Sequence, residues 1–513
     1  MRKQTFIQGA MILLAAGILN RILGFIPRIA LPRIIGAEGI GLYQMGYPLL
    51  IVLITIVTGG IPLAVAKLVA EFESKADHIR VKRILRSSLA ITAGIGTFLS
   101  LACMAGAKWI STHVLTDERV YFTFLIMSPT ILIISISAVL RGYFQGKQNM
   151  IPSAASQTVE TIIRAAAVLI FAYIALPHGI EYAAAGAMMG VLIGEISGML
   201  VLLITFWRQR SATKDMDKSA GFRHDLGRLA QISIPVTGSK LVGSGSYFLE
   251  SVMIVQSLAY AGIAVHIATS QYGILQGMVM PLLLLPTALT YSLAVSLVPS
   301  LSEAAAQGNY RLIHLRMHQS LRLALVTGAP FVVIMFTLSE PLTQLLYNNA
   351  EAGIMLQMMA PAALFIYFQA PLNAALQALD KPGTALLNTF IGASVKLILI
   401  FLLAAKLKMG ITGAVIASCI NMAIVTLLHW FSVRKLLGLQ LQLSDFTKVG
   451  AGMIIMGIFC VIWMQQAVFF PEALRFISAC AIGAAAYFGW MIAAKVIDHD
   501  DLVRIPWIGR WFL

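Results

Sequence analysis

The chain has 513 residues, of which 59% are hydrophobic and only 12% are charged, and its mean hydropathy is +0.85. Soluble globular domains carry about 25% charged residues, so the composition excludes that class and predicts an all-α protein that crosses a membrane many times. The net charge of +15 does not indicate a nucleic-acid partner, because the basic residues cluster in short segments between apolar runs, which is typical of membrane topology.

Apolar segments long enough to cross a bilayer predict about fourteen helices. Met1-Arg2-Lys3 and the apolar run behind it resemble a signal peptide. The run is too long for one and contains Arg21, so we interpret it as an uncleaved first helix. The predicted spans are 5–27, 42–68, 87–108, 121–140, 153–176, 183–207, 229–258, 271–299, 321–339, 354–378, 384–405, 411–432, 447–468 and 475–496.

The distribution of Lys and Arg predicts the orientation of these spans. An even number of spans places both termini on one side, and the basic segments 75–86, 208–228 and 434–448 lie on that side. Both termini are therefore expected in the cytoplasm. The tail 498–513 mixes tryptophan and arginine, so we expect it to lie on the cytoplasmic membrane surface.

One predicted span carries glycine at every fourth position. Gly186, Gly190, Gly194 and Gly198 fall on one face of the helix expected at 183–207. Small residues at this spacing let two helices approach closely. We interpret this face as a packing surface within the chain and not as a dimer contact.

The chain contains a weak internal repeat. Met127-Ser128-Pro129 recurs as Met359-Ala360-Pro361, and Pro152 recurs as Pro382, in each case about 230 residues later. Six spans separate the matched positions, so the two halves have the same orientation. This predicts two six-helix lobes related by an axis along the membrane normal, with a substrate site between them. The predicted parts are an N-lobe with a basic loop, a C-lobe, and two final helices with the tail, at residues 1–228, 229–446 and 447–513.

Five basic residues lie inside the predicted spans, where an unpaired charge costs several kcal/mol. From the expected cytoplasmic helix starts, three of them lie about 16–18 Å into hydrocarbon that is about 30 Å thick. We interpret the set as the lining of a water-filled cavity that binds an anionic substrate; the alternative is snorkelling of the side chains to the interface. The five residues are Arg21, Arg28, Arg164, Lys240 and Lys396, of which the last three share this depth.

Acidic residues in the spans are fewer and are expected to balance charge or couple an ion. Glu160 lies four residues before Arg164, so the two side chains can pair along one helix face, and a purely structural ion pair is the alternative. Glu195 lies in the middle of its span and Glu250 toward the outer end of another. The surplus of positive charge suits a phosphate or pyrophosphate headgroup, which arginine binds with a planar fork of donors.

The sequence predicts neither an enzyme nor a cofactor. His314 and His318 have the spacing of half a metal site, but no carboxylate or cysteine accompanies them, so we interpret them as a solvated helix face. No Walker motif, HExxH motif or nucleophile elbow occurs in a suitable context. The four cysteines are scattered through apolar spans without a CxxC pair.

Three segments resemble a known family. They are the helix-connecting residues 140–150 (LRGYFQGKQNM), the helix start at 179–188 (GIEYAAAGAM), and the first span with KQTF at 3–6 and NRILGF at 20–25. Together they resemble the stage V sporulation protein B family of endospore-forming bacteria. That family lies in the polysaccharide-transport branch of the multidrug/oligosaccharidyl-lipid/polysaccharide exporter superfamily.

The resemblance implies a fourteen-helix, two-lobed, V-shaped carrier in the membrane around the forespore. It also implies a role in making spore cortex peptidoglycan by moving a lipid-linked precursor outward. Related lipid II flippases use basic residues of the first helix, within an Arg-x-x-Gly-Phe-type segment. Arg21 and Gly24-Phe25 match that segment, whereas Arg28 comes one position late and Ile29 stands where an acidic residue is often found.

These observations lead to the hypothesis of an alternating-access flippase for a lipid-linked peptidoglycan precursor or related oligosaccharide lipid. Its expected partners are that lipid, membrane lipids, a coupling cation and cortex-synthesis enzymes. A cation-coupled multidrug exporter of the same architecture is one alternative, although it would need an acid-dominated cavity. A non-transporting membrane scaffold is another, but it would not need charges in the middle of the membrane. A polyprenyl-dependent glycosyltransferase would need catalytic carboxylates in a sizeable loop.

Overall fold

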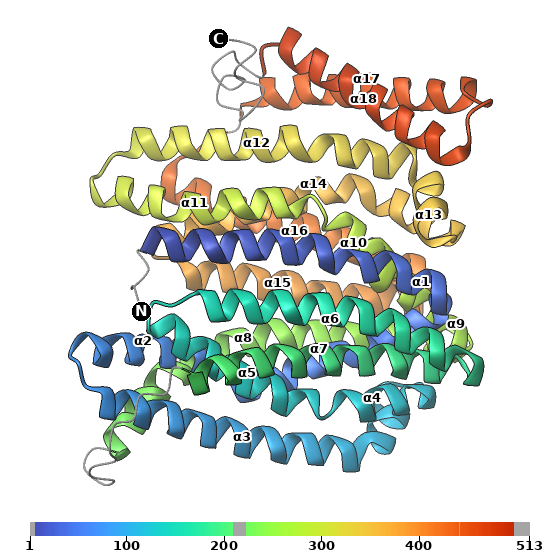
Figure 1. The fold of residues 1–513 in the computed structure, drawn as a ribbon. Helices are drawn as coiled ribbons and strands as arrows, with labels where there is room; N and C mark the ends of the chain where they lie inside the picture. Colours follow the sequence, from blue (N-terminus) through green and yellow to red (C-terminus); the bar gives the residue numbers. More distant parts are fainter. Residues whose placement is uncertain (1–5, 209–221, 441, 497–513) are drawn as a thin grey trace. The chain divides into compact units, whose positions relative to one another are not determined.

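The computed structural model describes residues 6–208, 222–440 and 442–496, and every regular element in these ranges is a helix. The all-α class predicted from composition is confirmed. The chain forms two compact units, residues 1–277 and 278–513 (Figure 1). The lobe boundaries expected at 228 and 446 stay predictions, and the tail expected at 498–513 lies outside the described residues.

The helices of the first unit follow the predicted spans, with longer ends. Two of the expected spans are joined in α1, and another is divided between α4 and α5. The helices are α1 Phe6–Thr58, α2 Ile61–Ser74, α3 His78–Trp109, α4 Tyr121–Met127, α5 Thr130–Gly146, α6 Ile151–Ala175, α7 Ile180–Arg208, α8 Phe222–Tyr260 and α9 Val265–Gly273.

Helix α1 is too long to be a single crossing. Its 53 residues would extend about 80 Å, more than twice the thickness of the hydrocarbon core. Gly36 interrupts it with φ 68° and ψ −178°, a conformation that side chains with a Cβ rarely adopt. The segment 28–41, which the span pattern leaves as a connection, is therefore helical on both sides of one glycine break.

A second break separates α1 from α2 at Gly59-Gly60, inside the span predicted at 42–68. Helix α8 supports this break: Thr237 Oγ1 accepts a hydrogen bond of 2.9 Å from the backbone N–H of Gly60. A Cβ at either glycine would collide with Thr237 or with the backbone of Ser233. The break thus depends on two residues without side chains lying directly against α8.

The glycine face predicted on 183–207 packs against α6, as Figure 1 shows for α6 and α7. A Cβ at Gly190 would overlap the backbone of Val168, and one at Gly186 would overlap the carbonyl of Phe171. The prediction of close packing within the chain is confirmed. This approach brings polar side chains of α6 and α7 within reach of each other.

The second unit contains the remaining helices. Its two last helices, α17 and α18, lie side by side (Figure 1), and the buried Tyr487 hydroxyl of α18 donates a 3.0 Å hydrogen bond to the Val326 carbonyl of α12. The helices are α10 Met280–Leu283, α11 Thr287–Ala306, α12 Tyr310–Thr337, α13 Ser339–Tyr347, α14 Ala350–Ala378, α15 Pro382–Leu399, α16 Ile411–Leu437, α17 Leu443–Gln466 and α18 Glu472–Ala493.

Within the described ranges, eleven helices are long and apolar enough to cross a membrane, or twelve when one bent pair counts as a span. One of the eleven is the 64-residue stretch Met11–Ser74, which contains the predicted span 42–68 and most of the predicted span 5–27. Large apolar side chains also lie on the surface, including Phe98 at 69% exposure and Ile22 at 64%. Lipid is the solvent that suits such a surface. The chain is a multi-pass membrane protein, and the count of about fourteen spans stays a prediction.

An ionic cluster joins three segments of the first unit. The buried Asp117 carboxylate accepts hydrogen bonds from Arg119 Nη2 at 2.8 Å and from Thr269 Oγ1 of α9 at 2.8 Å. Arg119 also donates to Glu38 of α1 at 2.5 Å. Burial by itself would raise the pKa of Asp117, but the hydrogen bonds from Arg119 and Thr269 outweigh it and hold that pKa below its ordinary value.

The cluster is expected to make the stability of this unit depend on pH. Because the pKa of Asp117 is lowered in the folded protein, its stabilisation is present above the ordinary pKa of about 4 and is lost as the pH falls through the folded pKa. Asp117→Asn should therefore lower the melting temperature of the detergent-solubilised protein at neutral pH. The difference from wild type should shrink in acid; a difference independent of pH would contradict this account.

Candidate functional site

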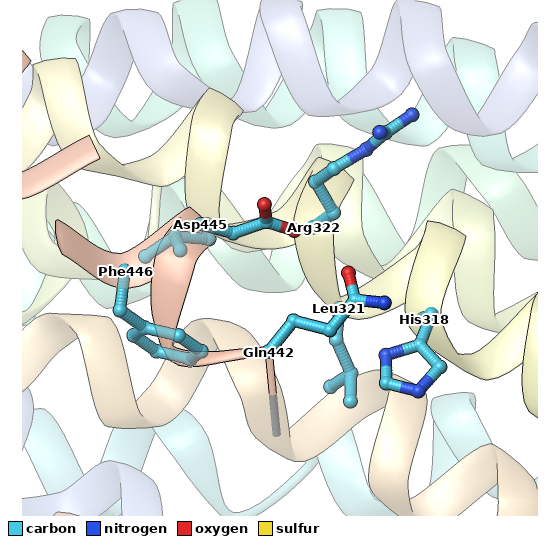
Figure 2. Close-up of a pocket in the computed structure, with 7 residues that line it drawn as sticks. His318, Leu321, Arg322, Gln442, Asp445 and Phe446 are labelled. Carbon is cyan, nitrogen blue, oxygen red and sulfur yellow. The ribbon is translucent and has the colours of Figure 1, made fainter. Parts of the chain in front are cut away.

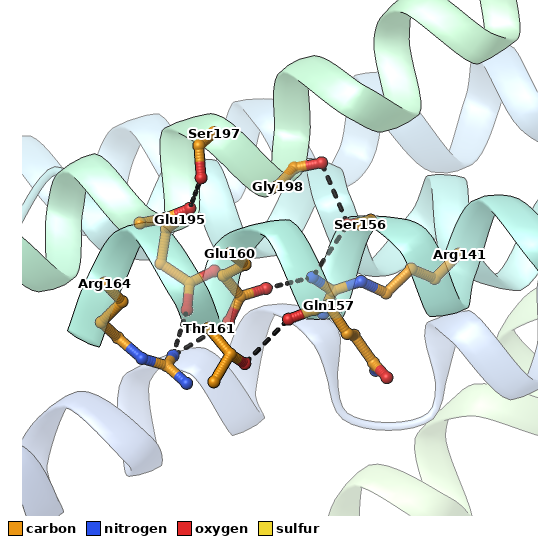
Figure 3. A network of polar contacts seen from close by, with 10 residues as sticks. Arg141, Ser156, Gln157, Glu160, Thr161, Arg164, Glu195, Ser197 and Gly198 are labelled. Atoms are coloured by element: carbon orange, nitrogen blue, oxygen red, sulfur yellow. Dashed lines mark hydrogen bonds and ion pairs between the residues drawn. The ribbon is translucent and has the colours of Figure 1, made fainter. Parts of the chain in front are cut away.

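Four charged side chains from three helices of the first unit form one network (Figure 3). Arg141 Nη2 of α5 lies 2.6 Å from Glu160 Oε2 of α6. Arg164 Nη1 of α6 lies 2.9 Å from Glu160 Oε1 and 3.6 Å from Glu195 Oε1 of α7. We call Arg141, Glu160, Arg164 and Glu195 the charged quartet.

Local sequence explains how the quartet assembles. Glu160 and Arg164 are four residues apart on α6, which places their side chains on one face. Helix α7 approaches that face at Gly194, where a Cβ would lie 2.5 Å from the Cβ of Arg164. Ser156 Oγ donates a 3.0 Å hydrogen bond to the Gly198 carbonyl and joins the two helices further along. The glycine spacing therefore positions Glu195 beside Arg164.

Exposure within the quartet is uneven. The side chains of Glu160 and Glu195 are each 9% exposed and that of Arg141 is 19% exposed, whereas that of Arg164 is 30% exposed. Buried carboxylates with arginine partners escape the large cost of an isolated charge in the membrane. Arg164 is the member of the quartet that an external ligand can reach most easily.

Helix α1 adds aromatic hydroxyl groups and a further cation near Arg164. The rings of Tyr43 and Tyr47 lie 6.2 Å apart. Arg28 and Arg164 are both within electrostatic reach of the two hydroxyl groups. Arg28 is exposed on α1. The predicted residues Arg28, Arg164, Glu160 and Glu195 therefore share one neighbourhood of the first unit.

The other predicted site residues differ in their surroundings. Arg21 is exposed on α1. Glu250 is buried on α8 within electrostatic reach of Tyr247, whose hydroxyl is also within electrostatic reach of Tyr47 and Arg28. Lys240 Nζ donates a 2.9 Å hydrogen bond to the carbonyl of Gly59, at the break between α1 and α2. Lys396 lies half-buried on α15 in the second unit. Substrate binding by Arg21, Lys240 and Lys396 stays a prediction, and so does the role of Glu250 in charge balance or ion coupling.

The contact of Lys240 with a helix end suggests a structural role that can be tested. Lys240→Met removes the hydrogen bond from Lys240 Nζ to the Gly59 carbonyl and should cost about 1 kcal/mol of stability. Lys75→Met, in an exposed ion pair with Glu71, is the control and should change stability little. Thermal unfolding in detergent measures both. Unchanged unfolding would contradict this structural role; substrate binding by Lys240 is a separate question that transport measurements test.

Two groups of residues in and around the charged quartet are not indicated by the sequence pattern. Arg141 lies in the segment that carries the family resemblance, but the predicted spans assign it to a connection. Tyr43 and Tyr47 lie in an apolar helix, and their spacing matches no binding motif. Arg141 could have been found only from the position of α5 beside α6, which is a tertiary contact.

A pocket in the second unit lies between α12 and α17 (Figure 2). Its polar lining residues are His318, Arg322, Gln442 and Asp445. His314, one turn from His318, places Nε2 2.6 Å from the carbonyl of Leu437. The pocket contains none of the five residues predicted to bind substrate and none of the three predicted to balance charge or couple an ion.

Comparison with known proteins identifies the family. A family model described as polysaccharide biosynthesis protein matches residues 6–305, and one described as MatE matches residues 245–402. Stage V sporulation protein B of Bacillus subtilis (strain 168) is 40% identical over 515 aligned residues, covering 99% of each chain. The chain belongs to the polysaccharide biosynthesis protein family. This confirms the resemblance drawn from residues 140–150 and 179–188.

Other members and structures agree with this membership. Lipid II flippase MurJ of Bacillus subtilis (strain 168) is 28% identical, covering 84% of this chain and 82% of that one. The solved structure of "Lipid II flippase MurJ, inward closed conformation" has a TM-score of 0.71 at 17% identity, covering 96% of this chain and 100% of that one. The solved structure of an inward-facing multidrug resistance MATE family transporter has a TM-score of 0.67 at 14% identity, covering 82% of this chain and 94% of that one. The structural likenesses establish the fold.

The family and its relatives define a coarse function. The chain is a membrane transporter of the multidrug/oligosaccharidyl-lipid/polysaccharide exporter superfamily, not an enzyme. Within the charged quartet, Arg164 is a guanidinium with 30% of its side chain exposed, a group that can bind an anion.

Proposed function

We propose that this transporter moves a lipid-linked peptidoglycan precursor, or a related oligosaccharide lipid, across the membrane by alternating access. The observation that carries the proposal is Arg164, a partly exposed guanidinium held within membrane-spanning helices by Glu160 and Glu195. A diphosphate is the part of such a lipid that a guanidinium binds best, with two parallel charge-assisted hydrogen bonds. The sugar and peptide would occupy polar space while the polyprenyl chain stays in lipid.

The proposal assigns roles to all predicted site residues. Arg21, Arg28 and Arg164 bind the diphosphate, together with Lys240 and Lys396. Glu160 holds Arg164, and Glu195 or Glu250 couples transport to an ion. The names of the relatives support the substrate class and the cellular setting, but not the residue roles: one relative is called a lipid II flippase and one a sporulation protein. We therefore also propose that the transporter serves spore cortex synthesis in the membrane around the forespore. From the distribution of Lys and Arg, we propose that both termini lie in the cytoplasm.

A second candidate is favoured by the MatE match over residues 245–402. It is a cation-coupled multidrug exporter. A cationic drug would need a site in which carboxylates exceed basic groups, whereas the quartet has two of each and Arg28 lies near it. The charges therefore favour the anionic lipid. Resistance of an overexpressing strain to cationic drugs would support the second candidate.

Reconstitution tests the proposed function directly. Purified full-length protein in vesicles should move labelled lipid-linked precursor between leaflets faster than empty vesicles do. Vesicles with the same lipid lacking its headgroup and diphosphate provide the comparison. No acceleration of any lipid-linked substrate, with intact folded protein in the vesicles, would refute the proposal.

A further inference from the structure

Arg141 makes the shortest ion pair of the charged quartet. Its Nη2 lies 2.6 Å from Glu160 Oε2, compared with 2.9 Å and 3.6 Å for the two contacts of Arg164. Its side chain is 19% exposed, so it is less accessible than Arg164 at 30%. The guanidinium of Arg141 is directed at Glu160, as Figure 3 shows.

Glu160 bridges the two arginines with separate oxygen atoms. Oε2 faces Arg141 and Oε1 faces Arg164. Ser156 stabilises the Arg141 end, because its Oγ lies 3.4 Å from Arg141 Nη2 while donating to the Gly198 carbonyl at 3.0 Å. Three helices thus hold the Arg141–Glu160 pair in place.

The contacts of Glu160 with both arginines determine the net positive charge that a ligand meets at Arg164. With Glu160 as its neighbour and no second cation, Arg164 would present a neutral pair to an anion. Arg141 adds a second positive charge, so Arg141, Glu160 and Arg164 together carry one net positive charge, which Glu195 balances when no ligand is bound. Glu195 makes the longest contact with Arg164, so it is the carboxylate that an incoming phosphate oxygen can most easily replace.

We propose that Arg141 is a positioning residue that balances the charge of Glu160 and thereby keeps Arg164 available to a diphosphate. This inference rests on the proposed function, because it assumes that Arg164 meets an anionic headgroup. It differs from a purely structural ion pair in one measurable respect. If Arg141 acts through the charge of Glu160, a variant that lacks both Arg141 and the charge of Glu160 should regain the affinity for pyrophosphate that is lost with Arg141 alone.

The test measures binding of inorganic pyrophosphate to full-length protein in detergent by calorimetry. Arg141→Gln should weaken binding about tenfold or more, because Glu160 then neutralises Arg164. The double variant Arg141→Gln with Glu160→Gln should recover most of that loss, and Arg141→Lys should bind more tightly than Arg141→Gln. Arg80→Gln, at a side chain 47% exposed on α3, is the surface control and should leave affinity unchanged.

Two results would overturn the inference. One is a double variant as weak as Arg141→Gln, which would show that Arg141 acts through packing. The other is wild-type protein that fails to bind pyrophosphate at millimolar concentrations. If Arg141→Gln alone does not fold, comparison of Arg141→Lys and the double variant with wild type decides the question. Failure of the proposed function would look different: charge-dependent pyrophosphate binding would persist while vesicles showed no lipid movement.

Discussion

Arg164→Glu is expected to abolish transport while the protein still inserts in the membrane. The change removes the accessible cation and places a third carboxylate beside Glu160 and Glu195. A charge-assisted hydrogen bond from a guanidinium to a phosphate contributes about 1.5–3 kcal/mol, so its loss alone predicts a decrease in rate of about tenfold to a hundredfold, and the introduced carboxylate also repels the phosphate. Initial rates in reconstituted vesicles and cortex formation in sporulating cells measure the effect.

Graded and matched variants separate charge from folding. Arg164→Lys keeps the charge but loses the planar fork, so it should retain partial transport and exceed Arg164→Gln. Arg316→Glu, at an exposed position of α12, is the control for a charge reversal away from the quartet and should transport as wild type does. Normal cortex in cells that carry Arg164→Glu would remove the basis for a role of this arginine.

Gly194→Ala is expected to destabilise the first unit and to reduce transport together. The added methyl would lie 2.5 Å from Arg164 Cβ and 3.0 Å from its Cα, so α6 and α7 must move apart. Overpacking of this kind costs about 1–3 kcal/mol, more than the gain of about 1 kcal/mol from replacing a helical glycine by alanine. Thermal unfolding in detergent and vesicle transport should both decline.

Gly94→Ala provides the matched comparison on α3. A Cβ there meets nothing within 4 Å, so only the gain in helix propensity remains. The two alanine variants should therefore shift the melting temperature in opposite directions. A stabilised Gly194→Ala protein would mean that α6 and α7 do not depend on this close approach.

Part of the site could be predicted from sequence because its determinants are local. The Glu160–Arg164 pair follows from the four-residue spacing on one helix. The glycine face of α7 predicts a close neighbour, although the sequence alone does not say that α6 is that neighbour. Arg141 required the position of α5, which no local pattern encodes.

The structure differs from the predicted spans for the same reason, namely that tertiary contacts are not encoded in local patterns. The hydropathy of residues 42–68 is continuous, so nothing in it shows that Gly59-Gly60 ends a helix or that Lys240 of α8 binds the carbonyl there. The segment 28–41 looks like a connection because it contains one proline and three glycines, yet only Gly36 leaves the helical conformation. Helix breaks in apolar segments depend on single glycines and their packing partners, whereas span location depends on average hydropathy.

Direct binding of the lipid tests the central role of Arg164 most simply. Native mass spectrometry of full-length protein can compare lipid II with the same polyprenyl chain lacking diphosphate and headgroup, in wild type and in Arg164→Gln. We expect wild type to retain lipid II at least about tenfold better than Arg164→Gln does, while the uncharged lipid binds the two proteins equally. Equal retention of lipid II by both proteins would contradict the assignment of Arg164 to the diphosphate.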